Sequence, residues 1–257
     1  MSRIVILAAV FLLAACAGVA QHPEEPVSQQ QTSNDASQRA KVHTELGSLY
    51  LVRGNLSVAL EEARIALSAD ANYAPAHNLM GLVHMQLQEA SLAEASFERA
   101  LRLAPADPEI NNSFGWFLCQ TARERRSLQY FQNALKSPLY ATPTMTYANA
   151  GICSLRIKDD KAAEEYFLNA LRADNRNDRA IYFLADIAYR QNRLAAARQR
   201  LTELHKLVEP TSDTLWLAAR VERKLGDREA EARYSSQLRR RFPGTPELQR
   251  LMQGQYE

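Results

Sequence analysis

A pattern that returns about every 34 residues constrains the fold of this chain more than any other feature. It is marked by the small residues Gly47, Gly81, Gly115, Gly151 and Ala185. These positions are separated by steps of 34, 34, 36 and 34 residues, and a second small residue follows each of them after twelve positions. Repeats of this length are supersecondary units that bury a shared core by stacking on their neighbours, so the pattern predicts a solenoid.

The composition indicates that the repeating unit is helical. The chain has 9 Gly and 10 Pro against 40 Ala among 257 residues, which favours helix over an all-β sandwich or barrel. Turn signals such as Arg53-Gly54-Asn55 and Lys158-Asp159-Asp160 divide the units into two halves. Large side chains at positions 97, 131 and 167 are expected to fill the gap to the next repeat.

This unit resembles the tetratricopeptide repeat (TPR), a helix–turn–helix of 34 residues. The resemblance implies an all-α, right-handed superhelix, an α-solenoid whose concave face is lined by the first helix of each repeat. We expect six repeats, at about 40–73, 74–107, 108–143, 144–177, 178–210 and 211–243. The remaining stretch, 244–257, is expected to form a C-terminal cap or tail.

The first residues read as a targeting segment. Arg3 precedes an apolar run of about twelve residues, which is too short to span a bilayer and is typical of a signal peptide. The run ends in Leu13-Ala14-Ala15-Cys16, which resembles the lipobox of bacterial lipoproteins. The resemblance implies cleavage after residue 15, a covalent lipid on Cys16 and an outer-membrane location facing the periplasm. Residues 16–39 are polar and poor in large apolar side chains, so we expect a disordered tether there.

Several classes of function are disfavoured. The 31 basic and 29 acidic residues give a net charge of +2, which argues against a nucleic-acid partner. No phosphate-binding loop, nucleophile elbow or zinc-protease motif is present, so we predict no enzyme activity, no small-molecule substrate and no cofactor besides the lipid on Cys16. His77 and His84 share a helix face but lack a third ligand, so a metal site is not expected. The chain is expected to be a monomer.

The two remaining cysteines predict a disulfide. Cys119 and Cys153 fall at positions 12 and 10 of the first helices of repeats three and four, which should be neighbours. Similar heights on adjacent helices are compatible with the Cα separation of about 4.4–6.8 Å that a disulfide requires. The alternative is a pair of buried thiols.

Three further features narrow the resemblance. Repeat three opens with the string from Asn111 to Gln120, NNSFGWFLCQ; two residues are inserted in SPLYATP at 137–143; and Asn149-Ala150-Gly151-Ile152-Cys153 follows. Together with the lipobox, these strings resemble the PilW or PilF lipoproteins of type IV pilus biogenesis, the pilotins of the pilus secretin. One departure is Ala141, where the family would place Pro.

The resemblance implies that the chain binds pilus secretin subunits and promotes their targeting to the outer membrane and their multimerisation. The alternative is an outer-membrane TPR lipoprotein that scaffolds peptidoglycan or other envelope enzymes. In either case the partner should lie on the concave face, where positions 5, 9, 12 and 13 of the first helices usually point. The candidate groove residues are Leu51, Val52, Asn78, Leu82, Met85, Asn112, Trp116, Ile152, Tyr182 and Tyr189.

Overall fold

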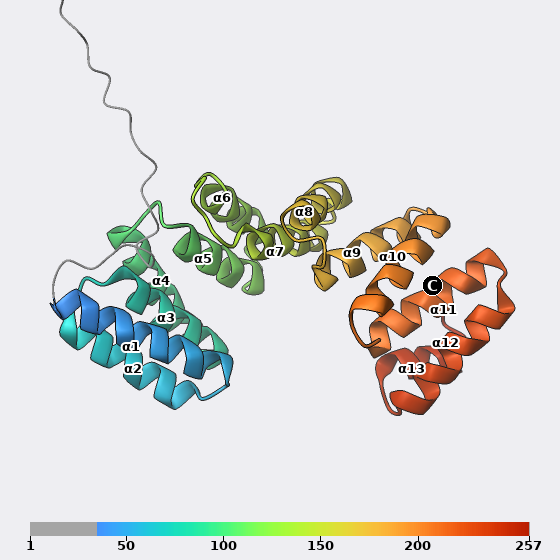
Figure 1. Ribbon diagram of the computed structural model, residues 1–257, viewed down its shortest axis with the longest axis horizontal. Helices are drawn as coiled ribbons and strands as arrows, with labels where there is room; N and C mark the ends of the chain where they lie inside the picture. Colours follow the sequence, from blue (N-terminus) through green and yellow to red (C-terminus); the bar gives the residue numbers. More distant parts are fainter. Residues whose placement is uncertain (1–34, 257) are drawn as a thin grey trace, which may run out of the picture.

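The computed structural model describes residues 35–256, and this part of the chain consists of thirteen helices without a strand. The helices form a curved array in which consecutive pairs follow one another from the N-terminal to the C-terminal end (Figure 1). Their bounds are α1 Asp35–Val52, α2 Leu56–Ala69, α3 Ala74–Gln86, α4 Ala90–Leu103, α5 Pro108–Gln120, α6 Glu124–Ala134, α7 Pro143–Arg156, α8 Asp160–Ala173, α9 Asp178–Arg190, α10 Leu194–Leu207, α11 Ser212–Leu225, α12 Arg228–Arg241 and α13 Pro246–Met252.

The helices pair as the sequence pattern predicts. The odd-numbered helix of each repeat packs against the following even-numbered helix, and each even-numbered helix packs against the first helix of the next repeat. First helices also contact one another along the array, for example α1 with α3 and α3 with α5. In Figure 1, α5 and α7 lie toward the inner side of the curve and α6 and α8 toward its outer side. The all-α solenoid is therefore confirmed.

The boundary between tether and repeats lies earlier than the sequence suggested. Helix α1 begins at Asp35, so residues 35–39 are helical rather than part of a disordered tether. Ala40 is fully buried in a cluster with Ala66 and Tyr73, which anchors this first turn. The predicted signal peptide, Cys16 and the rest of the tether lie outside the described residues. At the other end, α13 lies in the stretch expected to form a cap.

Phenylalanine rings pack on glycines within the central repeats. A Cβ atom added to Gly115 would lie 2.8 Å from the ring of Phe131, and one added to Gly151 would lie 2.7 Å from the ring of Phe167. Both rings are fully buried.

The rings also fill the gap to the next repeat, as the sequence predicts: Phe97 lies 5.4 Å from Phe117, and Phe167 stacks on Phe183 at 5.1 Å. Phe131 shares a cluster with Ala150 and Cys153 of the next first helix. Each ring thus contacts the first helix of its own repeat, where only glycine leaves room for it, and the first helix of the next repeat.

In the first repeat, a different side chain fills the space beside the glycine. Its counterpart of the phenylalanine is Ala63, which is too small to reach Gly47. Leu79 from the next repeat takes the place, since a Cβ atom on Gly47 would lie 2.6 Å from its Cδ2. The first and second repeats are thereby joined through a shared apolar cluster.

The unusual residues of repeat three serve the turns around it. Asn111 is 1% exposed, and its Nδ2 donates to the carbonyl oxygens of Pro105 (2.9 Å) and Asp107 (2.8 Å). An apolar side chain would leave these carbonyls without that donor, which explains the asparagine. In the inserted segment Tyr140 is buried, and its hydroxyl lies 3.0 Å from Oγ1 of Thr146.

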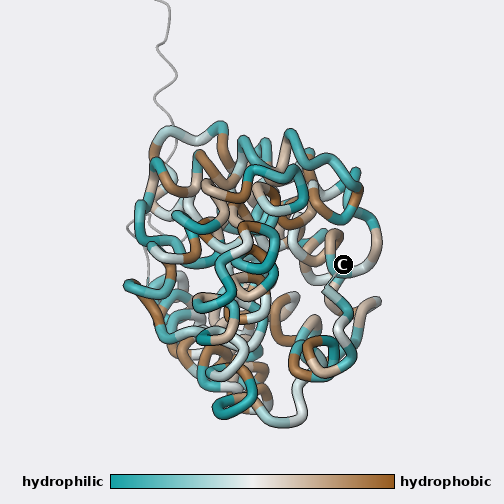
Figure 2. Tube along the Cα trace, turned by 90° about the vertical axis from the view of Figure 1, so that its right-hand side faces the viewer, coloured by the Kyte–Doolittle hydropathy of each residue, from teal (hydrophilic) through white to brown (hydrophobic). Residues whose placement is uncertain are grey.

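Apolar and polar residues alternate along the helices, as amphipathic packing requires (Figure 2). Each helix buries one stripe against its neighbours and leaves the rest in water. Within residues 35–256, no helix is both long enough and apolar enough to cross a membrane.

Candidate protein-binding face

Seven of the ten predicted groove residues lie half-buried on the first helices of repeats two to five. They are Asn78, Leu82, Met85, Asn112, Trp116, Ile152 and Tyr182. We call this set the inner face. Half-burial means that each side chain contacts the core on one side and retains some surface for a partner. The set is mostly apolar, with two amides and a phenol, which suits a partly apolar peptide that also needs hydrogen bonds.

Trp116 is the largest side chain of the inner face. Its neighbour Gly115 faces Phe131 inside the repeat, and a step of one residue turns a helix by about 100°, so the indole points elsewhere. The indole packs partly against the cluster of Cys119, Ala150 and Cys153. The guanidinium carbon of Arg179, on α9, lies 5.9 Å from its ring centroid, which is within the range of a cation–π contact. Trp116 thus links repeats three, four and five.

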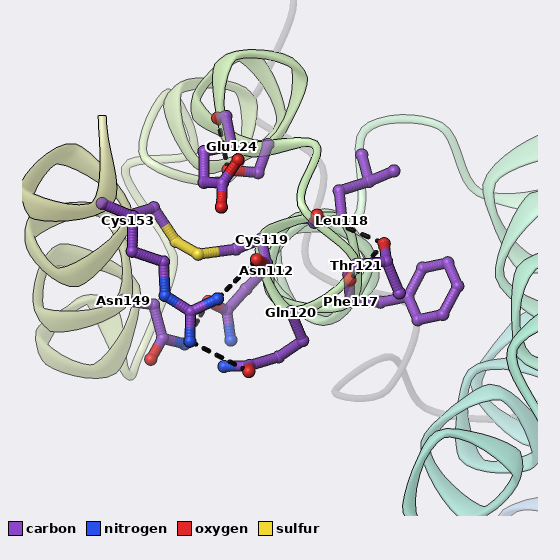
Figure 3. Close-up of a disulfide and its surroundings, with 11 residues drawn as sticks. Asn112, Phe117, Leu118, Cys119, Gln120, Thr121, Glu124, Asn149 and Cys153 are labelled. Atoms are coloured by element: carbon purple, nitrogen blue, oxygen red, sulfur yellow. Dashed lines mark hydrogen bonds between the residues drawn. A yellow bond between two sulfur atoms is a disulfide. The ribbon is translucent and has the colours of Figure 1, made fainter. Parts of the chain in front are cut away.

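A disulfide joins the first helices of repeats three and four beneath the inner face. Cys119 and Cys153 are bonded, with their Cα atoms 5.9 Å apart, and both are fully buried (Figure 3). Arg156 supports the same junction, because its guanidinium donates to the carbonyl oxygen of Cys119 at 2.6 Å and to Oε1 of Gln120 at 3.0 Å. The two helices that carry Trp116 and Ile152 are therefore held in one relative position.

An amide pair lies on the same junction. Nδ2 of Asn149 donates to Oδ1 of Asn112 over 3.2 Å, from α7 to α5 (Figure 3). Asn149 is buried and Asn112 is half-buried. The pair fixes the side chain of Asn112 next to Trp116, four residues along the helix, which leaves the amide nitrogen of Asn112 as a donor for a partner.

Three of the predicted groove residues are placed differently. Leu51 is buried with Ala59, Ala63 and Leu79, so it belongs to the core of the first repeat rather than to a groove. Tyr189 is 3% exposed and is covered by the C-terminal residues, whose carbonyl at Tyr256 accepts its hydroxyl proton at 3.3 Å. Val52, at the end of α1, is instead 87% exposed and does not form part of a recess.

A cavity of about 270 Å³ lies where α9, α10 and α11 meet. Its walls include Arg179, Tyr182, Phe183, Asp213 and Thr214. Burial raises the pKa of Tyr182 above its ordinary value, with nearby Asp213 and Asp186 acting in the same direction, so the phenol remains a neutral donor. This cavity extends the inner face toward the last repeat and adds a recess to an otherwise shallow surface.

The sequence reasoning missed two residues at the second position of a repeat. Arg179 lies over Trp116, and Met145 is 59% exposed near the start of α7. The sequence analysis predicts inner side chains only at positions 5, 9, 12 and 13. The signal that could have found both residues was their shared place one turn before position 5, on the same side of the first helix.

Within the described part of the chain, no three His, Cys, Asp or Glu side chains are grouped closely enough to hold a metal ion. The two histidines of the possible pair have separate partners: Nδ1 of His84 lies 2.6 Å from Oε2 of Glu89, and Nε2 of His77 lies 3.0 Å from the carbonyl oxygen of Ala71. Burial lowers the pKa of His77. The residues of the inner face offer apolar contact, amides and an aromatic–cation pair, which is the chemistry of protein binding.

Comparison with known proteins identifies the repeat and two similar proteins. The tetratricopeptide repeat model matches residues 44–108 and 160–204. The type IV pilus assembly protein PilF of Pseudomonas aeruginosa strain PAO1 is 28% identical over 218 residues, covering 85% of this chain and 86% of that protein. Its solved structure superposes with a TM-score of 0.80 and 28% identity, over 86% of this chain and 100% of that one.

A second solved structure is PilW, described as a widely conserved type IV pilus biogenesis factor. It superposes with a TM-score of 0.77 and is 30% identical, over 84% of this chain and 99% of that one. The similarity thus runs through nearly all of the described helices rather than through single repeats. The chain therefore belongs to the family of PilF and PilW, the TPR proteins of type IV pilus biogenesis.

Proposed function

We propose that this protein is a lipid-anchored pilotin of the outer membrane, which binds type IV pilus secretin subunits and promotes their targeting and multimerisation. The observation that carries the proposal is the 30% identity to the pilus biogenesis factor PilW over 99% of its solved structure. The pilotin role and the secretin partner go beyond that similarity. They rest on the lipobox at Leu13–Cys16 and on the chemistry of the inner face.

The inner face suits an extended, partly apolar segment of the secretin. Leu82 and Met85 on α3 and Ile152 on α7 offer apolar surface on either side of α5 along the array. Trp116 offers a large aromatic contact at the centre, where binding energy is usually concentrated. A secretin subunit crossing the periplasm carries strand edges that would aggregate if left unpaired, and a carrier that covers one segment reduces this hazard.

The membrane anchor is the second part of the proposal. Cys16 is the residue expected to carry the lipid, and several acyl chains on one residue hold a protein at a membrane far more firmly than a single chain does. The lipid would decide where the bound subunit is delivered. The repeats need no contact with the membrane for this, because the segment between Cys16 and Asp35 joins them to the anchor.

The test is secretin assembly in a strain that lacks this protein. Heat-resistant secretin multimers in outer-membrane fractions should be lost on deletion and restored by the wild-type chain. The Cys16→Ala variant should restore neither multimers nor outer-membrane recovery of the protein itself. Intact multimers together with altered cell shape in the deletion strain would contradict the proposal and point to a scaffold of envelope enzymes.

A further inference from the structure

The C-terminal residues fold back onto the first helices of the last two repeats. Helix α13 ends at Met252, and Gly254 adopts a left-handed conformation with φ of 69°. The backbone N–H groups of Gly254 and Gln255 donate to the carbonyl oxygens of Leu251 (3.2 Å) and Arg250 (2.9 Å), which closes the helix in the manner of a Schellman motif. The turn directs Tyr256 toward α9 and α11.

Tyr256 is held as a peptide ligand would be. Its ring centroid lies 5.2 Å from that of Trp216, and the guanidinium carbon of Arg223 lies 4.0 Å from its ring. Its carbonyl oxygen accepts from Nε of Arg220 at 3.0 Å and from the hydroxyl of Tyr189 at 3.3 Å. One aromatic side chain and one backbone carbonyl of the C-terminal segment are thus recognised by four side chains from two repeats.

Within residues 35–256, the cations around Tyr256 outnumber the carboxylates that pair with them. Arg223 pairs with Glu231 at 3.0 Å, but among residues 35–256 neither Arg220 nor Lys224 lies within 4.0 Å of a carboxylate. Instead, Arg220 and Lys224 lie over the ring of Tyr189, at 4.4 and 4.3 Å. Two cations side by side, without a described acidic partner, favour a ligand that brings a carboxylate next to its aromatic residue.

We infer that Tyr189, Trp216, Arg220, Arg223 and Lys224 form a second peptide-binding site, which we call the tail site. Its ligand is an extended segment of a partner protein with an aromatic residue beside an acidic one. The chain's own Tyr256 occupies the site and competes with that segment. The inference is independent of the secretin proposal, because it uses other residues and holds for any partner of this chemistry.

The amount by which Tyr256 weakens the binding of a free peptide can be estimated. A tethered ligand acts at an effective concentration in the millimolar range for a short flexible linker, so a free peptide must exceed this to displace it. Removing the aromatic ring of Tyr256 in the full chain should therefore raise the apparent affinity of a free peptide by at least about tenfold. The probe is a synthetic peptide with the sequence of residues 253–257, Gln-Gly-Gln-Tyr-Glu.

The experiment is an NMR titration of the full chain that follows the indole N–H of Trp216. The Tyr256→Ala variant should bind the peptide at least about tenfold more tightly than the wild type. The matched control is Met252→Ala, which alters an exposed residue of the same tail and should bind like the wild type. Peptides in which Tyr is replaced by Ala, or Glu by Gln, should bind the Tyr256→Ala variant more weakly than the parent peptide.

Two results would overturn the inference. One is equal binding of the parent peptide to the wild type and the Tyr256→Ala variant, or no shift of the Trp216 resonance in either. The other is undiminished binding when Lys224→Gln is added to Tyr256→Ala, since Lys224 is exposed and its loss leaves the packing intact. A thermal melt of each variant confirms that the compared chains are folded.

Discussion

The two tryptophans of this protein lie on the first helices of different repeats and have opposite surroundings. Trp116, in repeat three, is half-buried, with one face on the disulfide junction and Arg179 above it. Trp216, in repeat six, is 4% exposed because the C-terminal residues cover it. A tryptophan on a first helix is thus half-buried in the middle of the solenoid and covered at its end. Position within a repeat is therefore insufficient to identify a binding residue; the segments that follow the last repeat decide as well.

The comparison predicts that truncating the buried tryptophan costs more stability than truncating the half-buried one. Trp216→Ala should lower the free energy of unfolding by about 3–5 kcal/mol, because it removes a large side chain from the cluster with Leu215, Leu238 and Leu251. Urea unfolding measures the change. Trp116→Ala should cost clearly less stability, and equal losses for the two variants would show that Trp116 is as much a core residue as Trp216.

The disulfide is expected to contribute the next largest effect. Replacing both Cys119 and Cys153 by Ala opens a loop of about 35 residues, worth about 3–4 kcal/mol in the chain-entropy model. Because the bond lies beneath Trp116 and far along the chain from Trp216, hydrogen exchange should rise in α5 and α7 but little in α11. Two freely alkylated thiols in protein purified from the periplasm would show that the bond does not form there.

The fold could be predicted closely because its rules are local. The register of small residues fixed the helix pairs, and the heights of Cys119 and Cys153 on adjacent first helices followed from that register alone. Helices α3, α5 and α9 begin at Ala74, Pro108 and Asp178, the first residues of the predicted repeats. Repetition makes each of these contacts a copy of its neighbours, so one pattern describes them all.

The binding face was harder to predict because its exceptions depend on contacts that no repeat contains. Leu51 became core because Ala63 leaves space that Leu79 fills from the next repeat. Tyr189 became buried because a segment 67 residues away covers it. Both exceptions lie near the ends of the solenoid, where a repeat lacks a regular neighbour and the flanking segments substitute for one.

Binding offers a test of the open tryptophan. Trp116→Ala should weaken secretin binding by about 2 kcal/mol, a typical value for an aromatic hot spot, which is a roughly 30-fold rise in Kd. Phe131→Ala is the matched control: it removes a fully buried ring from the same repeat and should cost about 3–5 kcal/mol of stability. Titration calorimetry and thermal unfolding separate the two effects. Unchanged affinity with a large loss of stability for Trp116→Ala would place the binding face elsewhere.

The smallest expected effect is a pH dependence of the stability, which arises from one histidine in each half of the solenoid. Burial lowers the pKa of His77, in repeat two, and of His205, in repeat five, below the ordinary value of about 6.5. The unfolded chain then binds more protons than the folded one as the pH falls through 6.5, so stability should decrease toward acid and level off once the pH is below the folded pKa values. Urea unfolding between pH 7.5 and 5.5 measures this slope, and carboxylates titrate mostly below that range. His205→Gln should flatten the slope, since His205 lacks a described hydrogen-bond partner at Nε2, and His77→Gln should flatten it further. A slope that both variants leave unchanged would mean that groups other than His77 and His205 carry the pH dependence of stability.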